Sequence, residues 1–358
     1  MIESLTIKGK TYPLPIFCPD ATRGVVKGLD TPDLLAAGVE GMIVNTWHLN
    51  HYPGRDFLLD CGGIKKLMGF DGLIISDSGG FQVHSLFQKI PGFGKITDRG
   101  LVTYTGPKKQ HKIIFRPEDS IRMQFALGSD IVICLDDFTP PSATRPRIEQ
   151  SVERTVSWAK RCRQEYDRQI KYWRLTDHER PLIFAVIQGH DDWECRRWCA
   201  QELLKIGFDG YCLGGQKFND HGGVDLDWSA KNAQLTPDDW PRYAMGFGKP
   251  DEIQAMIAQG YQIFDCVLPT RDARHARMYV HDPQKIKDYI FLNLNKSQYT
   301  HDRQPLDPHC QCHTCTTTTR EYLHHLYKIG DDSFARLASI HNLHFFVDTT
   351  KKPPVRNP

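Results

Sequence analysis

The fold is decided by a stretch in the middle of the chain, in which two short apolar runs flank a long amphipathic segment. Residues 131–134 read Ile-Val-Ile-Cys, and residues 183–186 read Ile-Phe-Ala-Val. Between them, apolar residues recur at spacings of four and three from Ile148 to Ala159, which places them on one face of a helix. Nearly continuous apolar runs are typical of strands covered by helices. This stretch therefore predicts a strand–helix–strand unit of a parallel sheet.

The same pattern extends in both directions from this unit. Helices are predicted after Asp30, an N-cap residue followed by Pro32, and from Lys249-Pro250. Further apolar runs lie at residues 42–44, 73–75, 211–213, 243–245 and 263–264. Repeated alternation of strands and helices predicts an α/β fold, and this length favours a (β/α)8 TIM barrel. A doubly wound open sheet is the alternative, but no G-x-G-x-x-G turn follows the first strand.

Composition restricts the class of protein further. The chain has 358 residues, of which 40% are hydrophobic and 25% charged, as in globular proteins. The net charge is only +2, so any contact with nucleic acid must come from a local basic surface. No apolar stretch approaches the ~20 residues of a membrane-spanning helix, and no secretory signal is expected at the N-terminus. The eleven cysteines are mostly scattered, which favours a reducing, cytoplasmic compartment.

Polar residues and glycines follow each apolar run. Because the carboxyl ends of barrel strands meet at one face, where active sites are built, we expect these residues to surround one site. They are Asn45, Asp77, Asp136, Gln188, Gly215, Gly246 and Asp265. Each could instead cap the helix that follows it. Three carboxylates, two amides and two glycines together predict a site for a polar, planar ligand.

A metal site is predicted near the C-terminus. Cys310, Cys312 and Cys315 place three thiolates within six residues, and tetrahedral zinc requires a fourth ligand. A helix is expected from Thr316 to Ile329, and a second helix begins after it. The resulting hairpin returns the chain toward the cysteines.

The fourth ligand is left open by spacing alone. His341 could complete a Cys3His site, but His324, His325 and His344 are competitors. Since all four zinc positions would be protein ligands, no position would remain for a reacting water. The metal is therefore expected to be structural.

These motifs together resemble those of the tRNA-guanine transglycosylase family. The resemblance rests on SDSGGFQ at residues 76–82, FDCVLPTR at residues 264–271 and the pattern Cys-x-Cys-x2-Cys-x25-His. Further matching stretches lie at residues 45–49, 126–130, 188–189 and 245–251. The ordered set runs from about residue 22 to residue 346, which makes it far more specific than any one motif.

The resemblance implies a zinc-containing barrel that exchanges guanine at the wobble position of certain tRNAs for a 7-deazaguanine. It implies Asp265 as the covalent nucleophile, Asp77 as the general acid/base, and a homodimer. The residues implied to bind the base are Asp136, Gln188, the backbone of Gly215, and Phe81 and Met245, which stack on its two faces. The residues implied to face the RNA are Arg271, Arg274 and Arg277.

The chemistry of the reaction suits these residue types. Cleavage of an N-glycosidic bond develops positive charge at the sugar, which a carboxylate can trap as a covalent intermediate. A second carboxylate must move a proton to the departing base and from the incoming base. Guanine presents two donors, N1–H and the exocyclic amine, beside the acceptor O6. Asp136 suits the donors, and an N–H from Gln188 or a glycine suits O6.

Three departures from the family pattern lie around the predicted base pocket. The loop Gln216–Asp220 replaces a small apolar or glycine-rich turn that leads to a glutamate, and it leaves the identity of the incoming base open. Phe138 and Trp47 replace residues that are usually cysteine and tyrosine. Elsewhere, Lys285, Lys287 and Lys296 form a basic run that is more typical of a solvated strand face than of an RNA contact.

The sequence predicts three parts of the chain and leaves two other functions open. The barrel is expected over residues 1–300, the zinc-binding helical subdomain over residues 301–346, and a disordered tail over residues 347–358. A base-exchange enzyme acting on DNA would share the same site. A non-catalytic RNA-binding partner subunit is disfavoured, because it would not need Asp77, Asp136 and Asp265 together.

Overall fold

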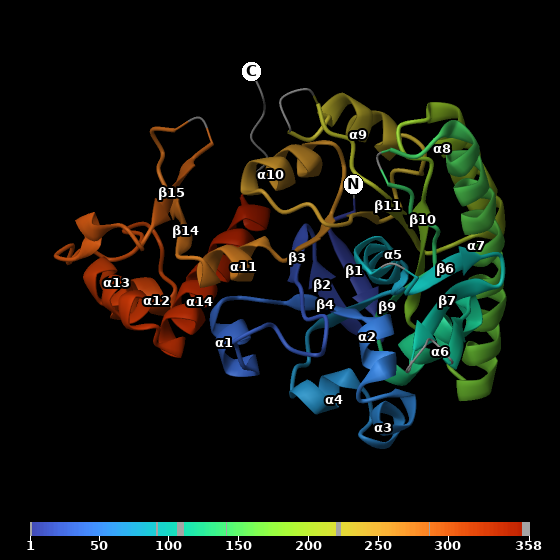
Figure 1. Cartoon of the computed structure of the whole chain (residues 1–358), viewed down its shortest axis with the longest axis horizontal. Helices are drawn as coiled ribbons and strands as arrows, with labels where there is room; N and C mark the ends of the chain where they lie inside the picture. The colour runs from blue at the N-terminus through green and yellow to red at the C-terminus, as the bar shows by residue number, and fades with distance from the viewer. Residues whose placement is uncertain are drawn as a thin grey trace.

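The barrel is the central feature of the computed structural model, which describes residues 2–90, 92–105, 111–140, 142–219, 223–285 and 287–352 (Figure 1). Eight strands pair in parallel, each beside its neighbour in chain order. They are β3 (Ile16–Pro19), β4 (Gly41–Asn45), β5 (Leu73–Asp77), β9 (Ile131–Ile133), β10 (Leu182–Ile187), β11 (Gly210–Leu213), β12 (Arg242–Ala244) and β13 (Ile263–Cys266). The predicted α/β barrel is confirmed.

The barrel closes where its first two strands meet. The Ala21 N–H donates to the Ile43 carbonyl over 2.7 Å, and Asp20 forms a parallel bridge with Ile43. A hairpin of β1 (Ser4–Ile7) and β2 (Lys10–Pro13) lies at the N-terminal end of the barrel strands. From the turn of this hairpin, Lys8 reaches the buried Asp130 at 3.5 Å, which ties the hairpin to the residue just before β9.

Seven of the eight barrel strands lie at the predicted apolar runs, and β3 is the one that the sequence analysis missed. Its core, Ile16-Phe17-Cys18, is fully buried, but Pro13, Pro15 and Pro19 surround it. Proline lacks an N–H donor and normally marks a loop or the edge of a sheet. The signal for a strand was therefore weak.

Helices alternate with the strands, and local sequence explains where they begin. In α1 (Thr31–Ala36), the Asp30 side chain accepts from the Asp33 N–H, and in α10 (Pro250–Ala258) a proline occupies the first turn. The others around the barrel are α2 (Thr46–His51), α3 (Arg55–Asp60), α4 (Ile64–Met68), α5 (Gly80–Lys89), α6 (Pro117–Leu127), α7 (Arg145–Trp173), α8 (Trp193–Ile206), α9 (Leu226–Ala233) and α11 (Leu268–Arg274). The predicted face of α7 is buried at Ile148, Val152 and Ala159.

A three-stranded antiparallel sheet interrupts the alternation between α5 and α6, and it was not predicted. It consists of β6 (Gly94–Thr97), β7 (Gly100–Thr105) and β8 (His111–Phe115), which lie beside α6 and α7 in Figure 1. Phe115 packs edge-on against Trp47 at the start of α2, with ring centroids 5.5 Å apart. The insertion thus covers one side of the barrel near the end of β4.

The C-terminal part contains a hydrophobic cluster of its own. It contains the hairpin of β14 (Arg277–His281) and β15 (Tyr289–Asn293), followed by α12 (His313–Thr317), α13 (Arg320–Ile329) and α14 (Asp332–Lys351). The helix predicted at 316–329 is therefore interrupted, because Thr318 is extended before Thr319 caps α13. The buried Met278 and Val280 of β14 share this cluster with α13. The domain boundary at residue 300 stays a prediction.

The prediction of a tail from residue 347 is wrong for its first five residues. Helix α14 continues to Lys351, because Val347, Thr349 and Thr350 are buried against the rest of the protein. Residues 353–358 lie outside the described residues. In the described ranges, no helix is long and apolar enough to cross a membrane.

Candidate active site and metal centre

Three carboxylates converge at the C-terminal end of the barrel strands. Asp77 ends β5, Asp136 follows β9, and Asp265 lies in β13. Burial, together with the charges of Asp136 and Asp265, raises the pKa of Asp77 to about 7. The buried thiol of Cys212, on β11, has its pKa raised by burial and by the charges of all three carboxylates. The three carboxylates therefore lie around one small region inside the barrel mouth.

The Asp265 carboxylate is held through one oxygen. Its Oδ1 accepts from the Tyr243 hydroxyl at 2.7 Å and from the Gly246 N–H at 2.8 Å. Burial raises the pKa of Asp265 to about 6, although both hydrogen bonds favour the charged form. Among the described residues, none donates a hydrogen bond to Oδ2. The group is fixed in place while one oxygen remains available to a ligand.

Asp77 has a different environment. It is 7% exposed, and its Oδ2 accepts from the Asn45 amide at 2.9 Å. Hydrogen bonds from Asn45 and Gln82 favour the carboxylate, but burial outweighs them and raises the pKa to about 7. A group with this pKa can both give and take a proton near neutral pH.

Asp136 faces the site, whereas its neighbour Asp137 forms ion pairs behind it. The Gln188 amide donates to Asp136 Oδ2 at 2.7 Å, and burial raises the pKa of Asp136 to about 6. Asp137 is fully buried and accepts from Arg147 and Arg154 of α7, each at 2.6 Å. The ion pairs with α7 are therefore formed by Asp137, and Asp136 bonds to Gln188 instead.

The turn after β11 requires two glycines. A Cβ on Gly214 would lie 2.8 Å from Gln188 Nε2 and 2.7 Å from a side-chain carbon of Val186. Gly215 has φ of 77°, which L side chains rarely adopt. Close packing thus brings Gly214 beside Gln188, and a Cβ on Gly215 would lie 3.9 Å from the Phe138 ring.

Two apolar side chains lie at the same end of the barrel. Phe81, in the first turn of α5, is 53% exposed and meets the edge of Phe138, with ring centroids 5.1 Å apart. Met245 follows β12 and is half-buried. Both therefore present accessible apolar surface to a planar ligand.

The predicted arginines lie just beyond β13, the strand that carries Asp265. Arg274 ends α11, and its Nη1 is buried with no hydrogen-bond partner among the described residues. The charge of Asp20 acts on the pKa of Arg274 and on that of Asp265, so Asp20 lies in electrostatic reach of both α11, which carries Arg274, and β13. Arg271 and Arg277 have side chains 53% and 49% exposed.

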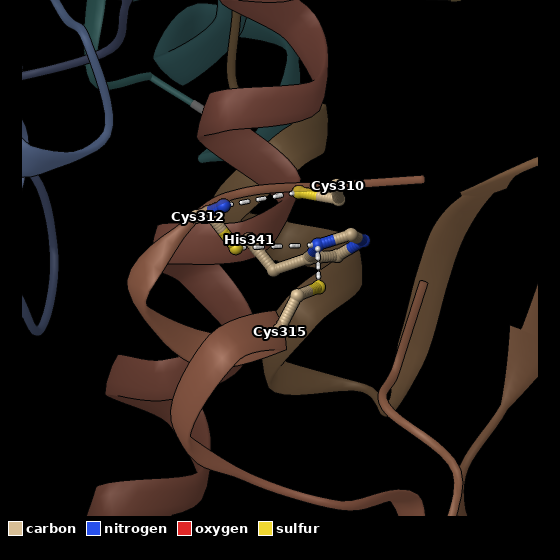
Figure 2. Close-up of side chains that lie close together, drawn as sticks. All are labelled: Cys310, Cys312, Cys315 and His341. Carbon is tan, nitrogen blue, oxygen red and sulfur yellow. Dashed lines mark hydrogen bonds between the residues drawn. The ribbon is translucent and has the colours of Figure 1, made fainter. Parts of the chain in front are cut away.

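Four ligand residues meet in the C-terminal cluster, as Figure 2 shows. The ligand atoms of Cys310, Cys312, Cys315 and His341 are buried and lie within 4.8 Å of one another. His341 Nδ1 is 3.2 Å from Cys315 Sγ and 3.6 Å from Cys312 Sγ. A tetrahedral zinc with bonds of about 2.0–2.3 Å places its ligand atoms roughly 3.5 Å apart, so these residues fit the ion.

Hydrogen bonding selects the ring nitrogen that faces the metal site. His341 Nε2 donates to the Tyr279 carbonyl at 2.6 Å, which leaves the Nδ1 lone pair directed at the sulfurs. Of the predicted competitors, His324 bonds to the Leu294 carbonyl at 2.6 Å instead. The group of four can hold a metal ion, and His341 rather than His324, His325 or His344 completes it.

Comparison with known proteins decides the family. The model of the family described as "Queuine tRNA-ribosyltransferase" matches residues 2–353. The chain belongs to the queuine tRNA-ribosyltransferase family. A queuine tRNA-ribosyltransferase of Solidesulfovibrio magneticus is 37% identical over 332 residues, covering 93% of this chain and 84% of the relative. One from Psychrobacter cryohalolentis is 38% identical, covering 93% and 83%, and one from Acinetobacter baylyi is 35% identical, covering 97% and 85%.

The departures from the queuine tRNA-ribosyltransferase pattern have local structural roles. Gln216 donates from Nε2 to the Met245 carbonyl at 3.3 Å, and Lys217 pairs with Asp225 at 3.3 Å. Asp220, the last residue of that loop, lies outside the described residues. Phe138 packs against Phe81, and Trp47 is buried against Phe115. In the predicted basic run, Lys287 pairs with Asp251 at 2.6 Å.

Three residues around the site were missed or not assigned a role from the sequence. Tyr243, which holds Asp265, lies in a run that was interpreted only as an apolar strand. Asn45, which holds Asp77, was noted only for its position after β4. Arg196, inside α8, carries no local signal that separates it from the exposed Arg197. A polar side chain within a barrel strand is the one signal that could have identified Tyr243.

Proposed function

We propose that this chain is a tRNA-guanine transglycosylase, which exchanges guanine at the anticodon wobble position for a 7-deazaguanine such as queuine or its precursor. The observation that carries the proposal is the convergence of Asp77, Asp136 and Asp265, with Asp265 held through Oδ1 alone. Membership of a family named for transfer to tRNA supports it.

In the first half of the reaction, Asp265 Oδ2 attacks C1′ of the ribose. The C1′–N9 bond breaks, its electron pair leaves with guanine, and a covalent Asp265–ribose ester forms. Asp77 gives a proton to the departing base. In the second half, Asp77 takes a proton from the incoming base, whose nitrogen attacks C1′ and releases Asp265.

The base is recognised along one edge. Asp136 accepts from N1–H and the exocyclic amine, and the Gln188 amide and Gly215 N–H donate to O6. Phe81 and Met245 stack on the faces of the ring. The Gln216–Met245 hydrogen bond lies beside this pocket, so Gln216 belongs to the surface that discriminates among incoming bases.

The RNA is held at the mouth, with its target base flipped out of the loop. Arg271, Arg274 and Arg277 bind phosphates, and one structural zinc at the Cys3His group supports this region. We extend the proposal to a homodimer, because the resemblance to the tRNA-guanine transglycosylase family implies one. All eleven cysteines are free, which supports a reducing, cytoplasmic compartment.

The direct test is nucleoside mass spectrometry after incubation with tRNA and each candidate base separately. The proposal requires a 7-deazaguanosine to appear in tRNA. Incorporation into single-stranded or duplex DNA but not tRNA would favour a DNA base-exchange enzyme. Absence of both exchange and a trapped covalent adduct would favour a non-catalytic partner subunit.

The pH profile of kcat/KM is expected to be bell-shaped and narrow. Exchange requires Asp265 ionised, with pKa about 6, and Asp77 protonated, with pKa about 7. In Tyr243→Phe, loss of a hydrogen bond to the charged form raises the pKa of Asp265 by about one unit. The acidic limb then moves to higher pH, so activity falls more at pH 6 than at pH 8. An unmoved acidic limb would contradict the assignment of that limb to Asp265.

Arg274→Gln is expected to weaken tRNA binding by about tenfold, because Nη1 is buried, has no hydrogen-bond partner among the described residues, and is proposed to bind a phosphate. The slope of log affinity against log salt should fall by roughly the 0.7 of one lost single-strand phosphate contact. Lys171→Gln, exposed in the last turn of α7, is the charge-matched control. Equal losses in the two variants would show that Arg274 contributes only general charge.

A further inference from the structure

Arg196 is a fully buried cation whose guanidinium, among the described residues, bonds only to backbone carbonyls. Its Nη2 donates to Gly214 O at 2.7 Å, Nη1 to Ile187 O at 2.9 Å, and Nε to His190 O at 3.1 Å. The guanidinium carbon lies 4.3 Å from the centroid of the Trp228 ring. Within the described ranges, no carboxylate oxygen lies within 4.0 Å of it.

Burying a cation that has no ion-pair partner costs free energy, so we expect the charge of Arg196 to have a function. Burial lowers the pKa of Arg196 to about 10, so the side chain still carries its proton at neutral pH. An apolar side chain of similar length would fill the same space beside Trp228 without the cost of desolvating a cation. The guanidinium charge acts most strongly on the three backbone carbonyls to which it bonds.

Two of these carbonyls belong to the peptides that precede Gln188 and Gly215, and the Gly215 N–H is the one proposed to donate to the base. The Ile187 carbonyl is joined to the Gln188 N–H through one planar peptide, and the Gly214 carbonyl is joined to the Gly215 N–H in the same way. A Cβ on Gly215 would lie only 3.9 Å from Arg196 Nη2. The guanidinium therefore lies directly behind the turn that faces the base.

A cation bonded to the carbonyl end of a peptide polarises the whole amide. The N–H at the other end becomes a stronger donor, because hydrogen bonds in a chain reinforce one another at low dielectric. In the proposed reaction, the electron pair of the broken C1′–N9 bond passes to guanine, and part of its negative charge reaches O6. A donor at O6 thus gains most when the bond is breaking.

We propose that Arg196 is a positioning residue that polarises the Gly214–Gly215 peptide, so that the Gly215 N–H stabilises the negative charge on O6 of the base. The inference rests on the proposed function, since it concerns the base bound in that site. Arg196 itself does not contact the base. It also aligns the turns after β10 and β11, because its three bonds join them to α8.

The test compares guanine with 6-thioguanine, in which sulfur replaces O6 and is a much weaker acceptor. Binding of each base to the full-length protein is measured for the wild type, Arg196→Met and Arg196→Lys, with the exposed Arg197→Met as matched control. We expect Arg196→Met to weaken guanine binding about tenfold more than 6-thioguanine binding. Arg196→Lys, which keeps the charge with fewer donors, should lose several-fold of the preference for guanine. Arg197→Met should leave it unchanged.

A purely structural role predicts equal losses for both bases, and that result would overturn the proposal. Should Arg196→Met fail to fold, as judged by thermal melting, the Arg196→Lys ratio decides, and an unchanged preference in it overturns the proposal. Exchange of labelled guanine into tRNA by the wild type tests the proposed function separately. Exchange in the wild type with an unchanged base preference in the variants would refute the role of Arg196 alone.

Discussion

Asp265→Asn is expected to reduce base exchange in tRNA by about 10⁴-fold or more, because the variant has no carboxylate to form the ribose ester. The change is nearly isosteric. The asparagine Oδ1 can still accept from the Tyr243 hydroxyl and the Gly246 N–H, so the loop after β12 should keep its position. The loss should therefore appear in the chemical step, with the melting temperature within about 2 °C of the wild type.

Two measurements check this prediction. One is incorporation of labelled guanine into tRNA. The other is a denaturing gel, on which the wild type should form a protein–tRNA adduct in the presence of a base analogue that stalls the second half of the reaction. Asp239→Asn, at an exposed aspartate before β12, is the control and should retain both properties. An adduct that still forms in Asp265→Asn would show that another residue is the nucleophile.

The barrel could be predicted because its strands are buried on both faces. Such strands must be apolar throughout, so they are visible in the sequence as short runs, and β9 and β10 stand out for this reason. The residue that follows each run is then predicted to lie at the C-terminal face of the barrel, where active sites are built. The strand β3 shows the limit of this reasoning, since the prolines around Phe17 weaken a signal that burial alone would have given.

The roles of neighbouring residues could not be separated in the same way. Asp136 and Asp137 are chemically identical and adjacent, but only Asp136 approaches Gln188, while Asp137 bonds to Arg147 and Arg154. The difference depends on which way each side chain points after β9, and that is set by α7 packing behind the strand. The residues next to Asp136 and Asp137 in the sequence do not indicate how α7 packs.

Contacts between residues that are far apart in the sequence could not be predicted either. Spacing left four histidines as possible ligands, and only the return of α14 to the cysteines selects His341. Arg196 is similar, because its three carbonyl partners lie in two separate turns and it resembles the exposed Arg197 in sequence. Residue type predicts what chemistry is possible, whereas tertiary contacts decide which copy of a residue performs it.

Removal of the metal is expected to have the second large effect, because α14 connects the metal ligands to the active site. His341 contributes a ligand, and the next residue, Asn342, donates to the carbonyls of Pro269 and Arg277 at 3.0 Å each. Pro269 lies in α11, directly after the strand that carries Asp265. The metal group thus holds the helix that carries Arg271 and Arg274.

Cys312→Ser should therefore lose bound zinc and lower the melting temperature by roughly 10 °C, since a serine hydroxyl is a poor ligand and several kcal/mol of metal binding are lost. The same variant should raise KM for tRNA more than KM for the base, because the proposed function places α11 against the RNA and the base-binding residues on other elements. Metal content by mass spectrometry, thermal melting and the two KM values check these expectations.

Cys61→Ser provides the matched control, because Cys61 is half-buried and bonds only to backbone carbonyls near α3. It should keep one zinc per chain and a wild-type melting temperature. If protein purified without chelators contains no zinc yet melts like Cys61→Ser, the four ligands form a metal-free cluster and the structural role of the ion is refuted. If zinc is lost while KM for tRNA stays unchanged, the metal stabilises the C-terminal helices but does not position the arginines of α11.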